Sequence, residues 1–152
     1  FFQKLSPGYV PLDDWGTLDL DAALKSVTEN AEADNTMRRR SGLPGIHVVG
    51  WLEPPNLDRS TNTVRWALEA AGEHGKPVVT SVALIFGRDG LEKLTWGGRK
   101  TMSDRQLLRI AQSSFSFAVG GRYIDYQHGD RIAQYGVADI VAAVLGTKRP
   151  PN

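Results

Sequence analysis

Apolar residues in the first third of the chain recur every three or four positions, the spacing of one face of an α-helix. They are Leu20, Ala23, Leu24, Val27 and Ala31. Asp19 or Asp21 can cap the start of this helix, and Gly42 followed by Pro44 is a stop signal. The pattern therefore predicts a long helix over residues 19–41.

Four later segments have the alternating or continuous apolar pattern of β-strands, at 46–53, 63–70, 78–86 and 91–96. The connectors between them are short, and short connectors require antiparallel neighbours. Segment 78–86 is apolar on both faces, which is typical of an interior strand. We therefore expect a four-stranded antiparallel meander.

Two further helices are predicted at 103–115 and 130–145, separated by an aromatic-rich loop. The order of elements is helix, four strands, helix, helix, which indicates an α+β fold. The chain of 152 residues suits a single domain, with the long N-terminal helix and the two C-terminal helices packed on the sheet.

A hairpin over residues 48–70 carries two tryptophans, Trp51 and Trp66. If the hairpin is centred near residues 57–58, the two rings face each other across the ladder and hold the strands together. The alternative is that the two rings form a platform for a ligand.

The loop of this hairpin contains Pro54, Pro55 and Asp58. Proline has no N–H to donate to a ladder, so the two prolines are expected to end the first strand. Asp58 is expected to form an Asx-turn, in which its carboxylate accepts from the backbone further along the loop.

The second half of the long helix places polar residues on the angular stripe that is apolar in the first half. These are Asp34, Asn35 and Arg38. A stripe that changes from apolar to polar without changing angle indicates that the helix extends past the core. The polar groups are then either solvated or bound to a protein partner, a second copy of the chain or an N-terminal portion of the protein that is missing from this sequence.

One loop brings Asp125, His128 and Asp130 close together in the sequence, and histidine with carboxylates can bind a metal or support hydrolysis. The competing interpretation is a structural loop in which Asp130 caps the last helix. There is no cysteine and the three histidines are dispersed, so we expect no bound metal and no cofactor.

The formal net charge is +1, which gives the chain no general attraction to nucleic acid. The basic stretch "MRRRSG" could contact a phosphate backbone, but acids on the same helix favour a solvated helix end. We expect no nucleic-acid partner.

The stretch "GWLEPPNLDRSTNTVRWA" resembles the signature Gly-Trp-x-x-x-Pro-x-Tyr-Asp-x-x-Thr-x-x-Leu-x-Trp-Ala of domain-of-unknown-function family 2167. The matching residues are Gly50, Trp51, Pro55, Asp58, Thr61, Trp66 and Ala67, whereas Leu57 and Val64 depart from the signature. "ENAEADNTMRRRSGLP" and "FSFAVGGRYIDYQHGDRIAQYGVADIV" are similar to the helix and the tail of that family. The resemblance covers nearly the whole chain.

This resemblance implies a bacterial protein with an N-terminal signal, an extracytoplasmic domain and a C-terminal membrane helix. The chain is then the periplasmic portion of a longer protein, held at the inner membrane through a segment absent from this sequence. The resemblance supplies no catalytic residues. Two function classes follow: a non-catalytic domain that binds a protein partner or an envelope ligand, and a hydrolase or metal-assisted enzyme that uses the carboxylates and His128.

Overall fold

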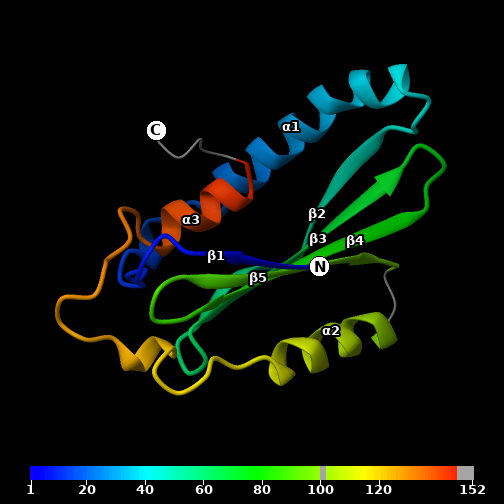
Figure 1. Ribbon diagram of the computed structural model, residues 1–152. Coiled ribbons are helices and arrows are strands. Elements are labelled where there is room, and N and C mark those ends of the chain that lie inside the picture. Colours follow the sequence, from blue (N-terminus) through cyan, green and yellow to red (C-terminus); the bar gives the residue numbers. More distant parts are fainter. Residues whose placement is uncertain (100–101, 147–152) are drawn as a thin grey trace.

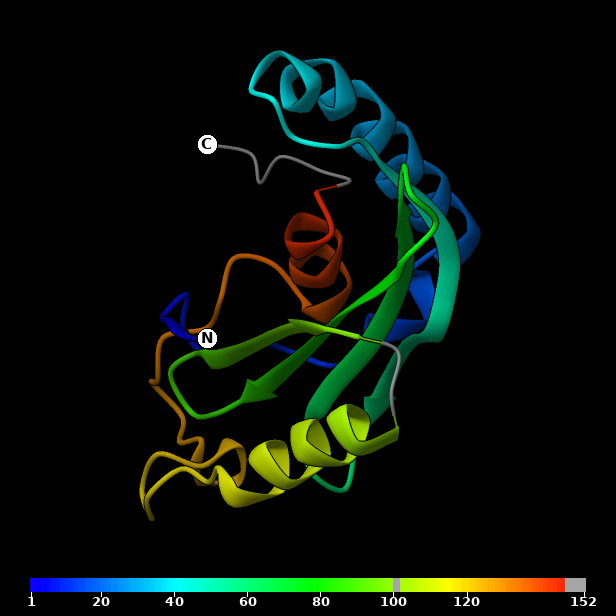
Figure 2. The same ribbon diagram turned by 90° about the vertical axis from the view of Figure 1, so that its right-hand side faces the viewer.

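The computed structural model describes residues 1–99 and 102–146 and shows an α+β fold built on a five-stranded antiparallel sheet. The strands are β1 (Phe2–Leu5), β2 (Ile46–Asp58), β3 (Thr63–Gly72), β4 (Pro77–Phe86) and β5 (Leu91–Gly98). The helices are α1 (Leu20–Arg40), α2 (Met102–Ser114) and α3 (Val137–Val144), with short 3-10 turns η1 (Trp15–Thr17) and η2 (Tyr123–Asp125). Helices α1 and α3 cover one face of the sheet, and α2 lies on the other (Figures 1 and 2).

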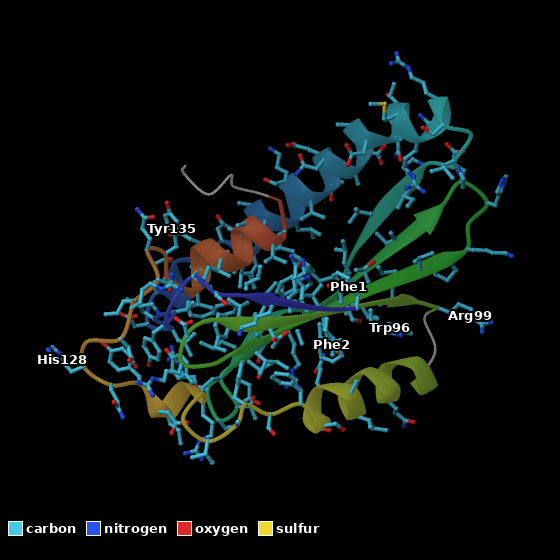
Figure 3. All side chains as sticks on the ribbon, viewed as in Figure 1. Phe1, Phe2, Trp96, Arg99, His128 and Tyr135 are labelled. Atoms are coloured by element: carbon cyan, nitrogen blue, oxygen red, sulfur yellow. The ribbon has the colours of Figure 1, made fainter. Side chains whose placement is uncertain are left out.

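The predicted meander is confirmed as β2 to β5, which neighbour one another in sequence order. The predicted count of four strands is wrong, because β1 adds a fifth strand beside β5. The Phe2 side chain from β1 reaches the α2 side of the sheet, where its ring centroid lies 6.2 Å from that of Phe115 (Figure 3). The strand was missed because its pairing partners lie far away in the sequence.

The start of α1 is fixed by Asp19, whose side-chain carboxylate accepts the backbone N–H of Ala22 at 3.0 Å. Its end is a Schellman motif. The Leu43 N–H donates to the Arg38 carbonyl at 2.8 Å, and the Gly42 N–H donates to the Arg39 carbonyl at 3.0 Å. Gly42 takes the left-handed conformation that this motif requires, with φ +73°. The predicted bounds of the helix are therefore confirmed to within one residue at each end.

The last helix is shorter than the predicted 130–145, because it begins at Val137. The residues before it run extended beside the N-terminal segment. The Tyr9 N–H donates to the Arg131 carbonyl at 2.8 Å, and the Ala133 N–H donates to the Tyr9 carbonyl at 2.7 Å. These backbone bonds replace the helical ones, so Asp130 does not cap the helix, and the prediction that it does is wrong.

Strand β2 continues through Pro54 and Pro55 instead of ending there, which corrects the prediction. The register is interrupted three times, between Val48 and Gly50, Trp51 and Glu53, and Glu53 and Asn56. Each interruption places one more residue on β2 than on β3, as in a β-bulge. Bulges and prolines are tolerated here because β2 is an edge strand of the sheet.

These bulges also change the pairing of the two tryptophans. The strands pair antiparallel as predicted, but Trp51 lies opposite Leu68, so the prediction that it faces Trp66 directly is wrong. Leu68 and Trp66 are two positions apart and share one face of β3. Trp51 is half-buried and packs against the core that contains Trp66. The two tryptophans therefore have a structural role, although they do not lie directly opposite each other in the ladder.

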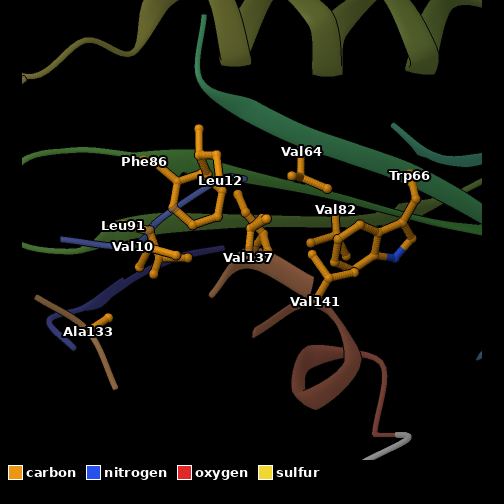
Figure 4. Packing of buried hydrophobic residues seen from close by; sticks show 11 residues of the cluster. Val10, Leu12, Val64, Trp66, Val82, Phe86, Leu91, Ala133, Val137 and Val141 are labelled. Atoms are coloured by element: carbon orange, nitrogen blue, oxygen red, sulfur yellow. The ribbon is translucent and has the colours of Figure 1, made fainter. Parts of the chain in front are cut away.

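The core lies between the sheet and α3 (Figure 4). Its buried members are Val10, Leu12, Val64, Trp66, Val82, Leu84, Phe86, Leu91, Ala133, Val137 and Val141. Trp66 is 4% exposed and lies beside Val82 and Val141 (Figure 4). Alternate positions of β3 and β4 supply this face, as the strand period requires.

None of the helices in the described part of the chain combines the length and the apolar character needed to cross a membrane.

Candidate functional site

The end of α1 forms a pocket of about 460 Å³ with the start of β2. It is lined by Ala31, Asp34, Met37, Arg38, Ser41, Leu43 and Ile46. Met37 and Leu43 are 68% and 50% exposed, so two large apolar side chains of the pocket lining face solvent. The Schellman motif explains why they meet here, since it brings the residue after the glycine back over the last helical turn. We call this set of lining residues the α1-end groove.

Two of the three predicted binding residues, Asp34 and Arg38, line the α1-end groove. Asp34 is exposed. The Arg38 side chain is half-buried, and its Nε donates to the Pro44 carbonyl at 2.9 Å. The groove therefore offers an apolar floor with one acidic and one basic side chain at its rim.

The third predicted residue, Asn35, is 1% exposed and does not line the groove. Its side-chain amide binds both backbone groups of Ile46. Nδ2 donates to the Ile46 carbonyl at 2.9 Å, and Oδ1 accepts the Ile46 N–H at 2.7 Å. The interpretation that Asn35 extends past the core is therefore wrong. The amide imitates a neighbouring strand and covers the beginning of the β2 edge.

A hydrogen bond and an ion pair that the sequence did not reveal flank Asn35 and join α1 to the sheet. Glu32 Oε1 lies 2.7 Å from His47 Nδ1, and Arg39 Nε donates to Glu73 Oε1 at 2.8 Å. The hydrogen bond from His47 is the largest cause that lowers the pKa of Glu32. The pKa of Glu73 is lowered first by the hydrogen bond from Arg39. The far half of α1 is therefore fixed on β2 and on the turn that follows β3, which gives the groove a defined shape.

The loop before α3 contains the predicted carboxylates Asp125 and Asp130. Both belong to one hydrogen-bond network with arginines. Asp125 accepts from Nε and Nη2 of Arg122, both at 2.9 Å, and from the Gly120 N–H at 2.9 Å. Asp130 accepts from Nε and Nη2 of Arg88 at 2.7 and 2.8 Å. Arg88 also donates to the Gly120 carbonyl at 3.2 Å, which links the two halves of the network.

His128 does not join these carboxylates. Its side chain is exposed and points away from the body of the molecule at the end of its loop (Figure 3). Within residues 1–99 and 102–146, no three histidine, aspartate or glutamate side chains are grouped so that they could hold a metal ion. The geometry favours the structural interpretation of the loop, in which both carboxylates position backbone instead of reacting.

A stack of tyrosines also holds this loop in place. The Tyr9 ring centroid lies 4.4 Å from that of Tyr123 and 4.3 Å from that of Tyr126. The Tyr123 hydroxyl donates to the Val10 carbonyl at 2.8 Å, and burial raises the pKa of this phenol. The loop is therefore anchored to the N-terminal segment as well as to Arg88.

The pairing of Asp130 with Arg88 predicts a pH-dependent contribution to stability. Arg88 is the largest cause that lowers the pKa of Asp130, from its ordinary 3.8 to about 2. The folded state thus favours the charged carboxylate. The stabilisation is complete above the unfolded-state pKa and is lost as the pH falls through the folded-state pKa. We expect Asp130→Asn to lower the urea midpoint at pH 7, and the difference from wild type to disappear as the pH approaches 2.

The matched control for this prediction is Asp89→Asn on the neighbouring turn. Its carboxylate lies 3.4 Å from Arg131, but both side chains are well exposed, and such pairs contribute little. The control should leave the midpoint almost unchanged at every pH. A pH-independent difference between wild type and Asp130→Asn would contradict the assigned role of the carboxylate.

The predicted Asx-turn of the hairpin is confirmed. Asp58 Oδ1 accepts the Ser60 N–H at 2.9 Å and the Ser60 hydroxyl at 2.6 Å, and the hydroxyl bond is the largest cause that lowers the pKa of Asp58. Pro55 is buried within the bulged part of β2. Trp66 belongs to the core, so the sequence motif of this hairpin is explained by folding rather than by a tryptophan platform.

Four residues of this region were not predicted from the sequence, namely Met37, Leu43, His47 and Glu73. The signal for Leu43 was present, because an apolar residue after a helix-ending glycine commonly packs back on the last turn. No local pattern predicts the pairs of His47 and Glu73, whose partners lie 15 and 34 residues away.

The model of one protein family matches residues 1–149, and its description is "Protein of unknown function (DUF2167)". Among curated proteins and solved structures, none matches the chain.

Proposed function

This chain belongs to the DUF2167 family, and we propose that it is a non-catalytic binding domain that holds a protein partner in the α1-end groove. The observation that carries the proposal is the position of Asp34 and Arg38 beside the exposed Met37 and Leu43. Exposed apolar side chains that adjoin one another inside a polar rim are typical of protein–protein interaction sites.

The proposed partner is a polypeptide that inserts an apolar side chain between Met37 and Leu43. Arg38 can donate to a backbone carbonyl or a carboxylate of the partner, and Asp34 can accept from an N–H or a basic side chain. The pocket of about 460 Å³ is large enough for one aromatic or long aliphatic side chain and part of its backbone. The fixed position of α1 reduces the entropy lost on binding.

We further propose that the domain acts on the extracytoplasmic side of a bacterial inner membrane, anchored by another part of the full-length protein. The resemblance of the hairpin and the tail to anchored proteins supports this location. An anchored domain with a fixed groove fits a role in assembly at the membrane surface, and it needs no catalytic groups.

The test places a photo-crosslinking amino acid at position 37 of the full-length protein in the cells that encode it. We expect one polypeptide to be crosslinked in the membrane fraction, and Arg38→Glu to reduce its yield by about tenfold through loss of a charged contact. Met37→Glu, assayed with the crosslinking amino acid at position 43 instead of 37, should reduce the crosslinking yield to the same extent. This substitution leaves the hydrogen bond between Arg38 and Pro44 in place.

The matched control is Arg40→Glu, which makes the same charge change on the same helical turn outside the groove. It should crosslink as wild type does. Equal yields from wild type and Arg38→Glu at low salt, where ion pairs are least screened, would exclude the groove as the binding site. Recovery of the full-length protein in the soluble cytoplasmic fraction would exclude the proposed location.

A further inference from the structure

A second and larger cavity, of about 790 Å³, lies between α2 and the β2–β4 part of the sheet. Helix α2 lies along the face of the sheet opposite α1, so this cavity is remote from the α1-end groove (Figures 1 and 2). We call it the α2 cleft. Its volume falls within the range of cavities that hold small molecules.

The α2 cleft is hollow because its floor is made of small side chains. Ala67 lies opposite Ser81 in the ladder between β3 and β4, and both residues line the cleft. They are 4% and 3% exposed. The bulged segment with Pro54 and Pro55 forms a wall. These prolines belong to the hairpin whose tryptophans pack on the core face of the sheet. The same hairpin thus also shapes a cavity on the opposite face.

Among the side chains that the structure describes, two guanidinium groups line the α2 cleft, those of Arg65 and Arg109. Arg65 Nη2 lies 3.8 Å from Asp58 Oδ2, and Arg109 Nη2 lies 3.6 Å from Glu53 Oε1. These distances exceed the roughly 2.7–2.9 Å of a direct charge-assisted hydrogen bond. Both groups therefore keep donors that can bind an anion entering the cleft.

Gln112 gives an independent indication of a ligand. It lines the α2 cleft, and its side-chain oxygen Oε1 is buried but accepts no hydrogen bond from any group in the described residues. A buried acceptor without a donor is costly, and such groups are rare in folded proteins. Gln112 lines the cleft, so a turn of its side-chain amide toward the cleft would let Oε1 accept from an O–H or N–H group of a bound molecule.

We propose that the α2 cleft binds a small organic carboxylate that also carries hydroxyl or amide donors. The carboxylate binds Arg65 and Arg109, a donor group binds Gln112 Oε1, and the carbon skeleton lies on Ala67 and the proline wall. The Glu53 carboxylate also lines the cleft beside Arg109, so the ligand carboxylate binds the guanidinium donors that Glu53 leaves open.

The test uses three probes that differ in one property each. Gluconate has a carboxylate and hydroxyls, gluconamide has the hydroxyls without the charge, and hexanoate has the charge without hydroxyl donors. We expect gluconate at millimolar concentration to shift the amide NMR signals of the residues around the cleft. The two other probes should bind about tenfold more weakly, as the loss of one charged or one buried hydrogen bond predicts.

Two variants locate the site. Arg109→Gln should weaken gluconate binding by about tenfold, and Arg40→Gln, the same change at the end of α1, should not alter it. Ala67→Leu should abolish binding because it fills the floor of the cleft. If gluconate causes no shifts at the cleft, if the three probes bind equally, or if Arg109→Gln binds as wild type does, the proposal is wrong. Crosslinking of the partner reports on the α1-end groove, and the NMR shifts report on the α2 cleft. The failure of one proposal can therefore be distinguished from the failure of the other.

Discussion

Replacing Trp66 with alanine is expected to destabilise the domain by about 3–5 kcal/mol, the usual cost of removing a large aromatic side chain from a core. Trp66 is 4% exposed and packs with Val82 on its own sheet face and with Val141 of α3. Its removal leaves a cavity at the contact between the sheet and the helix. Urea denaturation followed by circular dichroism gives the change in the free energy of unfolding without relying on tryptophan fluorescence.

The control for this prediction is Trp96→Ala in the same sheet. Trp66 lies opposite Val82 and Trp96 lies opposite Ser81, so the two rings are on opposite faces. Trp96 is only half-buried, and its loss should cost clearly less. Equal effects of the two substitutions, or an unchanged midpoint for Trp66→Ala, would show that the core is not centred where α3 meets β3 and β4.

The bounds of α1 could be predicted because every signal that sets them is local. Asp19 caps the first turn and Gly42 ends the last one, each through bonds that reach no more than five residues. The strands β2 to β5 could be predicted for a similar reason, since short turns join neighbours in sequence. By contrast, β1 pairs with residues near position 92, and no local pattern indicates that pairing.

The offset between Trp51 and Trp66 shows a different limit. Periodicity predicts which face a side chain occupies, but the register of a hairpin depends on the position of its turn and on every inserted residue. Here the turn follows Asp58, and β2 contains three interruptions. Counting outward from an assumed centre therefore predicts the correct strands and the wrong partners.

Part of the candidate site could be predicted from the sequence. Asp34 and Arg38 lie at the groove because the polar stripe does pass beyond the apolar core, as the helical pattern indicated. Asn35 was misplaced because a polar residue was assumed to need solvent or a partner outside the fold. An amide carries both a donor and an acceptor, so it can bind the edge of a strand as another strand does.

Replacing Asn35 with alanine should therefore destabilise the domain by about 2–4 kcal/mol, since two backbone groups of Ile46 lose their partner and each, being part-buried, costs about 1–2 kcal/mol, the lower part of the range for a buried group. Asn30→Ala is the matched control on the same helix, because the Asn30 amide donates to the Gly146 carbonyl in an exposed position. Its effect on the urea midpoint should be small.

The variant Asn35→Asp separates the donor from the acceptor at nearly constant shape. A carboxylate at position 35 can still accept the Ile46 N–H, but it faces the Ile46 carbonyl and lies beside Glu32, and both disfavour a negative charge. Its pKa is therefore raised in the folded state. Stability then favours the protonated form, so the deficit relative to wild type should be smallest at acidic pH and should grow as the pH rises through that raised pKa. Urea midpoints of wild type and variant across the pH range measure this directly. A deficit that stays constant with pH would mean that position 35 does not donate to the strand edge, and the role of Asn35 as a substitute for a neighbouring strand would have to be abandoned.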